Sequence, residues 1–92
     1  MPYIKQEERK EIEDWGELHH LIDYLKKTTK NGQEKSGNVV YVIYRIIKEI
    51  FGEGNFEVRS NALKVLESAK LEYYRRIMGP YEEEAILRNG DV

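Results

Sequence analysis

The chain has 92 residues, enough for one folded domain, and no cysteine, so disulfides, thiolate metal sites and cysteine nucleophiles are excluded. Its 15 basic and 17 acidic residues give a net charge of −2, which provides no overall field to attract nucleic acid or an anionic membrane. The longest apolar run, Val39 to Tyr44, is far shorter than the roughly 20 residues of a membrane span, and the first residues lack the apolar core of a signal peptide. We therefore expect one cytoplasmic domain over residues 1–92, without membrane contact.

Two helices are predicted in the first third of the chain. Residues 5–13 are almost wholly charged, so they form at most a short helix on the surface. Asp14 lies three residues before Glu17, the spacing at which a capping side chain and a carboxylate satisfy each other's backbone amides, and this predicts a helix start. That second helix runs to about Lys27. Its apolar face consists of Trp15, Leu18, Ile22 and Leu25.

A loop and a third helix are predicted in the middle of the chain. Residues 28–37 contain no apolar side chain and include an Asn-Gly pair, which is typical of a turn. Residues 38–51 are rich in valine, isoleucine and tyrosine, which favour strands, but their apolar side chains recur at the spacing of a helix. We therefore predict a helix over residues 38–51 and expect it to be the most buried element.

The longest predicted helix covers residues 59–78, after a connection in which Phe56 and Val58 are expected to turn inward. Ser60 or Asn61 can cap its free amides, and the following Gly79-Pro80 pair is expected to end it. Proline suits the first position of a helix, so a last helix is expected to begin at Pro80, with three glutamates near its positive end. The pair Asn89-Gly90 then ends that helix.

Together these elements predict an all-α fold, a small helical bundle of four to five helices with residues 38–51 at its centre. Leu71 and Met78 lie on the flank of the longest helix and widen its apolar surface beyond what one partner helix needs, which suggests self-association. The core is expected to contain Trp15, Leu18, Ile22, Leu25, Val39, Ile43, Ile47, Ile50, Leu63, Leu66, Tyr73 and Ile77.

A cluster of aromatic and basic residues near the end of the longest helix is the first candidate for chemistry. Arg75 and Arg76 follow Tyr73 and Tyr74, and planar guanidinium donors beside aromatic faces suit phosphates, carboxylates or stacked bases. Glu72 lies three and four residues before the two arginines and would neutralise them in an ordinary helix-surface pair. The balanced net charge makes nucleic-acid binding the weakest of these readings, so structural or interface use is favoured.

The acidic residues near the start of the chain form a second candidate. Glu7 and Glu11 share one face of a helix, with Glu8 beside them, and carboxylates at this spacing can hold Mg²⁺. The pattern resembles one half of the metal site in the all-α nucleotide pyrophosphohydrolases of the MazG type. Those enzymes add an E-x-x-D pair, a spacing that Glu17 and Asp23 do not have, so a solvated charged face is favoured.

The two histidines, His19 and His20, are adjacent, and neighbouring helical residues point about 100° apart, which is poor geometry for holding one metal ion. His19 and Asp23 stand four residues apart and could orient each other. A metal site needs a third ligand that the sequence does not identify. A surface hydrogen bond is therefore the favoured interpretation of this pair.

Four short stretches, MPYI at residues 1–4, LEYYRR at 71–76, PYEEEAI at 80–86 and NGDV at 89–92, together resemble a known family. It is a family of small uncharacterised proteins from prokaryotes and their viruses, described only as a domain of unknown function. The resemblance covers essentially the whole chain. It supports a single small helical unit and implies no activity, cofactor or partner.

In its middle that family typically has an Asn-Tyr-x-Ile-Thr-Arg stretch. Tyr41, Ile43 and Arg45 match it, while Val40 and Tyr44 replace the asparagine and the threonine, which removes two polar groups. If the family has a shared site, its polar side chains are expected among the matching residues. The candidates are Arg45, Glu72, Arg75, Arg76, Tyr81 and Glu82.

The leading hypothesis for function is a non-catalytic interaction or accessory protein that forms a homo-oligomer and binds a protein partner. It rests on the lack of a nucleophile, a complete metal set or a phosphate-binding loop, so we expect no cofactor and no metal. The alternative is a protein that binds a nucleotide or a phosphorylated metabolite, or a Mg²⁺-dependent hydrolase. In that case Arg75 and Arg76 would hold the phosphate and the N-terminal glutamates the metal.

Overall fold

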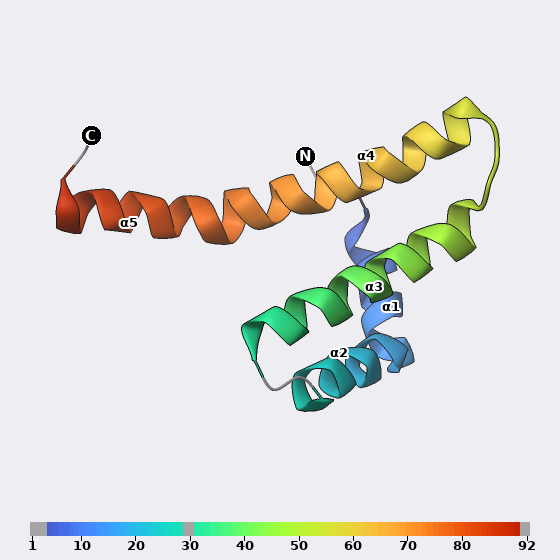
Figure 1. The fold of residues 1–92 in the computed structure, drawn as a ribbon, viewed down its shortest axis with the longest axis horizontal. Helices are drawn as coiled ribbons and strands as arrows, with labels where there is room; N and C mark the ends of the chain where they lie inside the picture. The colour runs from blue at the N-terminus through green and yellow to red at the C-terminus, as the bar shows by residue number, and fades with distance from the viewer. Residues whose placement is uncertain (1–3, 29–30, 91–92) are drawn as a thin grey trace. The chain divides into compact units, whose positions relative to one another are not determined.

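The computed structural model describes residues 4–28 and 31–90, and these residues contain helices and no strand. The elements, in chain order, are α1 (Gln6–Trp15), α2 (Glu17–Thr28), α3 (Gly32–Phe51), α4 (Phe56–Tyr73), a π-helical turn η1 (Tyr74–Met78) and α5 (Gly79–Asn89). Because α4, η1 and α5 follow one another without a break, they form one continuous helix, as the ribbon shows (Figure 1). The predicted all-α class is therefore confirmed.

Contacts between residues divide the chain into two units, with the boundary inside α3. The first unit, Met1–Ile46, holds α1, α2 and most of α3, and α1 and α2 are in contact with each other. The second unit, Ile47–Val92, holds the last residues of α3 and the long helix formed by α4, η1 and α5. Each unit is described separately below, and a single domain stays a prediction.

In the first unit, a glycine separates α1 from α2. Gly16 has a φ of 87°, the left-handed conformation that glycine adopts without steric cost, and it caps the C-terminus of α1. The predicted helix start at Asp14 was therefore wrong. Asp14 lies inside α1, where its carboxylate pairs with Nζ of Lys10 at 3.2 Å, so the charged stretch supports a helix as far as Trp15.

The third helix begins six residues earlier than its apolar pattern indicates. The predicted loop over residues 28–37 was wrong for most of its length, because α3 starts at Gly32, and residues 29 and 30 lie outside the described part of the chain. Lys35 N–H donates to the Asn31 carbonyl at 3.0 Å, and the hydroxyl of Ser36 donates to the Gly32 carbonyl at 2.9 Å. A helix therefore forms here from local backbone bonding, without an apolar stripe.

The start of α4 is fixed by Asn55. Its side-chain oxygen accepts a hydrogen bond of 3.0 Å from Val58 N–H, which satisfies one of the free amides of the first turn. The predicted caps Ser60 and Asn61 lie inside the helix, which begins earlier than expected. Phe56, expected to turn inward, is exposed at the first helical position.

The Gly79-Pro80 pair does not end the helix, contrary to the sequence prediction. Gly79 N–H donates to the carbonyl of Tyr74, five residues back, which is the hydrogen bond of a π turn. Proline inside an α-helix removes a hydrogen bond and collides with a carbonyl of the preceding turn, and a wider turn gives its ring room. A Cβ at position 79 would lie 3.1 Å from the Tyr74 carbonyl oxygen, so glycine suits this close approach.

One continuous helix therefore runs from Phe56 to Asn89, a length of 34 residues. At about 1.5 Å per residue it extends for about 50 Å. Its end is as predicted, because Gly90 follows Asn89 and donates its N–H to the Ile86 carbonyl.

The predicted core was wrong for the single chain. Among the described residues only Ala62 is buried. The described side chains of α3, expected to be the most buried helix, are exposed or half-buried. Of the twelve expected core residues, Leu18, Leu25 and Ile47 are half-buried. The exposed ones are Trp15, Ile22, Val39, Ile43, Ile50, Leu63, Leu66, Tyr73 and Ile77.

The make-up of the second unit accounts for the exposed apolar side chains of its long helix. In the described part of this unit, the long helix has one other helical segment beside it in the chain. That segment is the last part of α3, from Ile47 to Phe51. Five residues of helix span less than 10 Å and cannot cover a helix of about 50 Å. The apolar side chains that the periodicity identifies are therefore present on the helix, but their unit provides no surface to bury them.

Candidate functional site

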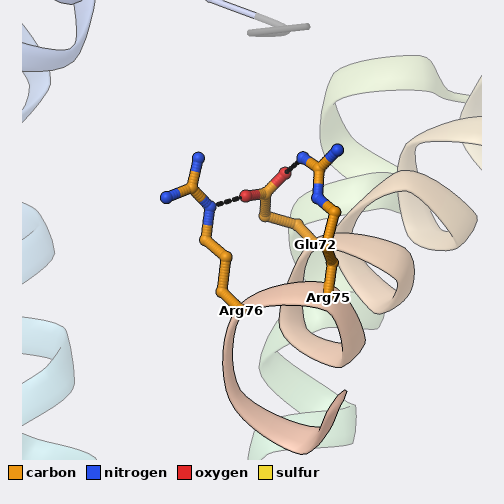
Figure 2. A network of polar contacts seen from close by, with 3 residues as sticks. All are labelled: Glu72, Arg75 and Arg76. Atoms are coloured by element: carbon orange, nitrogen blue, oxygen red, sulfur yellow. Dashed lines mark hydrogen bonds and ion pairs between the residues drawn. The ribbon is translucent and has the colours of Figure 1, made fainter. Parts of the chain in front are cut away.

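Three of the candidate residues meet where α4 passes into the π turn (Figure 2). Oε2 of Glu72 accepts a hydrogen bond of 2.9 Å from Nη2 of Arg75, and Oε1 accepts one from Nε of Arg76. The side chain of Glu72 is 18% exposed, whereas both arginine side chains are mostly exposed. One carboxylate thus binds two guanidinium groups, as the spacing of three and four residues predicts.

This arrangement lowers the pKa of Glu72. The largest cause is the hydrogen bond from Arg76, and the positive charges of both arginines act in the same direction, while partial desolvation opposes them. Glu72 is therefore an ionised acceptor at neutral pH, with its two oxygens already occupied. That state suits a structural ion pair better than a general acid.

A second polar contact joins the two sides of the π turn. The hydroxyl of Tyr74 donates a hydrogen bond of 2.9 Å to Oε2 of Glu82. This bond raises the pKa of Tyr74, and the negative charges of Glu82 and Glu83 add to the effect. Sequence reasoning selected Glu82 but missed Tyr74 as its partner, because the eight-residue separation is not a contact spacing of a regular α-helix.

Two grooves flank the π turn. The first has a volume of about 450 Å³ and contains both charge signs. The second, of about 370 Å³, is lined by Lys70, Leu71, Tyr73, Tyr74 and Met78. The residues around the first groove are Tyr74, Arg75, Gly79, Pro80, Glu82, Glu83 and Ile86. An anion in the first groove would face two carboxylates as well as one arginine, so this groove fits a partner surface of mixed charge better than a phosphate.

The two remaining candidates belong to other elements. Tyr81 belongs to α5 and its side chain is 60% exposed. Arg45 belongs to α3, in the first unit, where its Nη1 donates to the hydroxyl of Tyr41 at 3.3 Å. The structure therefore brings together Glu72, Arg75 and Arg76, and separately Glu82 with Tyr74.

The histidine and carboxylate candidates of the first unit form ordinary surface contacts. Nε2 of His19 lies 2.8 Å from Oε2 of Glu13, so its acidic neighbour comes from α1, and not from Asp23 as the helical spacing had suggested. Glu7 and Glu11 are exposed on α1. Over residues 4–28 and 31–90, no three histidine, aspartate or glutamate side chains gather closely enough to hold a metal ion.

Comparison with known proteins identifies the family of this chain. The chain belongs to the family described as "Domain of unknown function (DUF6899)", which matches residues 1–92 and therefore includes every candidate residue. No curated protein matches the chain, and no solved structure does. Within the described ranges, none of the helices combines the length and the apolar character that crossing a membrane requires.

Proposed function

We propose that this chain is a non-catalytic interaction protein that self-associates through its long helix. The observation that carries the proposal is the continuous helix Phe56–Asn89, whose large apolar side chains are exposed within a unit that has no second helix of comparable length. The longest helix of the other unit, α3, has 20 residues and spans about 30 Å, against about 50 Å for the long helix. A second copy supplies a helix of equal length.

The energetics favour such pairing. Most of the stability of a protein helix comes from packing its apolar face, because an isolated helix is only marginally stable in water. Burying a large apolar side chain contributes roughly 1.5 to 3 kcal/mol. Leu66, Tyr73, Ile77, Met78 and Tyr81 are all exposed along this helix. A few such side chains, buried in two copies, are enough to hold a dimer together.

The polar residues near the π turn fit an interface. Glu72 holds Arg75 and Arg76, and Glu82 holds Tyr74, so these groups are already satisfied in ordinary contacts. Charged residues that are paired at the edge of an apolar surface favour one partner and orientation over others. They support recognition, and none of them has the geometry of a nucleophile with its base.

The alternative, binding of a nucleotide or a phosphorylated metabolite, has one observation in its favour, since Arg75 lines the larger groove. Against it, the Glu72 carboxylate competes for both guanidinium groups. A thermal-shift screen with nucleotides and Mg²⁺ tests this alternative directly. A rise in melting temperature that the Arg75→Glu substitution abolishes would put phosphate binding first.

The self-association itself is tested by melting the protein at two concentrations a hundredfold apart. If folding and pairing are coupled, dilution favours the unfolded chains, and the melting temperature at the higher concentration is raised by on the order of 5 °C or more. Circular dichroism follows the loss of helix. An unchanged melting temperature over this range would contradict the proposed function.

A further inference from the structure

The one tryptophan of the chain lies in a groove where α1 meets α2. Trp15 is the last residue of α1, and it is 79% exposed. Tryptophan is highly buried on average, and exposed apolar side chains that lie together mark contact surfaces. The groove has a volume of about 370 Å³, and its lining residues are Glu11, Ile12, Trp15, Glu17 and Leu18.

Local structure fixes the two walls of this groove. Three of its residues share one face of α1, because they are separated from one another by one, three and four positions. Gly16, with its φ of 87°, ends α1 and leads directly into α2, whose first two residues supply the other wall. Across this turn, Nε2 of His19 lies 2.8 Å from Oε2 of Glu13. The groove is therefore formed before a partner binds, which lowers the entropy cost of binding.

The groove carries negative charge that its own chain does not neutralise. Its two charged residues are both carboxylates, Glu11 and Glu17. Over residues 4–28 and 31–90, neither carboxylate takes part in a side-chain hydrogen bond or an ion pair. Lys10, next to Glu11 in the sequence, instead pairs with Asp14 at 3.2 Å. An apolar groove with two such carboxylates is complementary to a cation that has an apolar stem.

We propose that this groove binds an arginine side chain of a partner protein, with the guanidinium group stacked on the indole ring of Trp15. Cations are attracted to the face of an aromatic ring, and tryptophan is the best ring for this contact. A guanidinium group is planar, so it can stack on the ring while its N–H groups donate to Glu11 or Glu17. The methylene stem of the arginine covers Ile12 and Leu18.

Other occupants fit the groove less well. The two carboxylates repel a phosphate or an anionic lipid surface, and a wholly apolar segment would bury them without partners. Lysine supplies the charge but has no planar group to stack. A metal ion needs further ligands, and within the described ranges no three acidic or histidine side chains gather to provide them. The volume lies near the lower end of the roughly 300 to 1,000 Å³ of ligand pockets, which suits a single long side chain.

The groove belongs to the first unit, so it does not depend on the self-association proposed for the long helix of the second unit. A second copy offers the adjacent arginines Arg75 and Arg76, but Glu72 already binds both of them. Those ion pairs would have to break before either arginine could enter the groove. The favoured occupant is therefore an arginine of a different protein.

Because Trp15 is the one tryptophan in the sequence, its fluorescence reports directly on the groove. The full chain is titrated with a capped hexapeptide in which two arginines are flanked by leucines and glycines. The same peptide with citrulline, which keeps the shape of arginine without its charge, is the first control, and the lysine peptide is the second. A saturable change in emission is expected for the arginine peptide, with a dissociation constant below about 1 mM. The citrulline peptide should bind about tenfold more weakly and the lysine peptide about threefold more weakly.

Substitutions in the groove test the two carboxylates. Glu11→Gln and Glu17→Gln keep the shape of the side chain, and each should weaken binding of the arginine peptide about three- to fivefold. Asp23→Asn is the matched control, because Asp23 is an exposed carboxylate of α2 that does not line the groove. It should leave the affinity unchanged. Circular dichroism verifies that each variant keeps its helix content.

Four results would overturn the proposal. They are no saturable change in emission up to about 1 mM peptide, equal binding of the arginine and citrulline peptides, equal binding of the arginine and lysine peptides, and an equal loss of affinity in Asp23→Asn. A change in emission with the concentration of the chain alone would also overturn it, because a second copy would then fill the groove. The proposed self-association is decided by melting at two concentrations, so the two claims can fail separately.

Discussion

The hydroxyl of Tyr74 donates a hydrogen bond of 2.9 Å to Oε2 of Glu82, from the first residue of the π turn to the first turn of α5. In a regular α-helix, residues eight apart are about 12 Å apart along the axis, so only a long side chain can bridge them. The contact links the two sides of the turn through side chains. It therefore helps to maintain the irregular backbone that Pro80 occupies.

This hydrogen bond predicts a dependence of stability on alkaline pH. Because the pKa of Tyr74 is raised above its ordinary value of about 10, the stabilisation is complete below pH 10 and is lost as the pH rises through the raised value. We expect Tyr74→Phe to lower the melting temperature at pH 8, and the difference from wild type to shrink at higher pH. In a phenolate absorbance titration, Tyr74→Phe should remove a late-ionising tyrosine.

If Tyr74→Phe lowers the total phenolate absorbance but leaves the late component in place, the pKa of Tyr74 is not raised and the bond to Glu82 does not persist in solution. Tyr81→Phe is the matched control, because it also removes one hydroxyl from the same helix, and no hydrogen bond from that hydroxyl is described in the structure. It should remove a tyrosine without removing the late component.

The pairing of Glu72 with both arginines predicts the opposite dependence on acid. Its pKa is lowered from about 4.5, so its stabilisation is complete above that value and is lost as the pH falls through the lowered pKa. Glu72→Gln is expected to melt at a lower temperature than wild type at pH 7, and the two proteins should converge as the pH is lowered below 4. Thermal melts across this range provide the measurement.

Glu84→Gln is the control. The structural role of the Glu72 ion pairs would be contradicted if the two variants lost the same amount of melting temperature. It would also be contradicted if the loss in Glu72→Gln stayed the same in acid.

The cap at Asn55 predicts a specific loss of stability. Asn55→Ala removes the side-chain acceptor of Val58 N–H and should lower the free energy of unfolding by about 1 kcal/mol, within the usual range of about 0.5 to 2. Asn61→Ala, in the exposed interior of the same helix, should change it by less than about 0.5 kcal/mol. Urea unfolding of both variants separates the positions. If both variants lost the same free energy of unfolding, the side chain of Asn55 would not act as the cap of α4.

The π turn predicts contrasting effects of two glycine substitutions. A Cβ at Gly79 would lie 3.1 Å from the carbonyl oxygen of Tyr74, whereas a Cβ at Gly37 in α3 meets nothing within 4 Å. Gly37→Ala should therefore stabilise the chain by roughly 0.5 to 1 kcal/mol, the ordinary gain within a helix. Gly79→Ala should bring no gain or a loss, because the turn must give way. A gain at position 79 equal to that at position 37 would indicate a regular α-helical turn there.

The sequence predicted the helices better than their ends. Apolar periodicity located α3 and α4, but it carries no information where a helix is polar, so the start of α3 at Gly32 was missed. The end at Asn89 was found because an Asn-Gly pair follows a short apolar pattern. Gly79-Pro80 was misread because these residues usually stop a helix, and a π turn that accommodates the proline has no simple local signature.

The candidate site was predictable only where helical spacing applies. Glu72 with Arg75 and Arg76 follows from separations of three and four residues, whereas Tyr74 with Glu82 spans the irregular turn. The core list failed for a different reason. Periodicity identifies which side chains need to be buried, but not whether their own chain or a second copy covers them.

The central claim, that this chain self-associates through its long helix, is tested most directly by the mass of the full chain in solution. Sedimentation equilibrium over a range of concentrations should give about twice 10.9 kDa for the wild type. Tyr81→Glu, among the exposed apolar side chains of the long helix, should return the mass to that of one chain. Leu87→Glu, six residues further and so about 120° around the same helix, should leave the dimer intact. A wild-type mass of 10.9 kDa at every concentration would contradict the account.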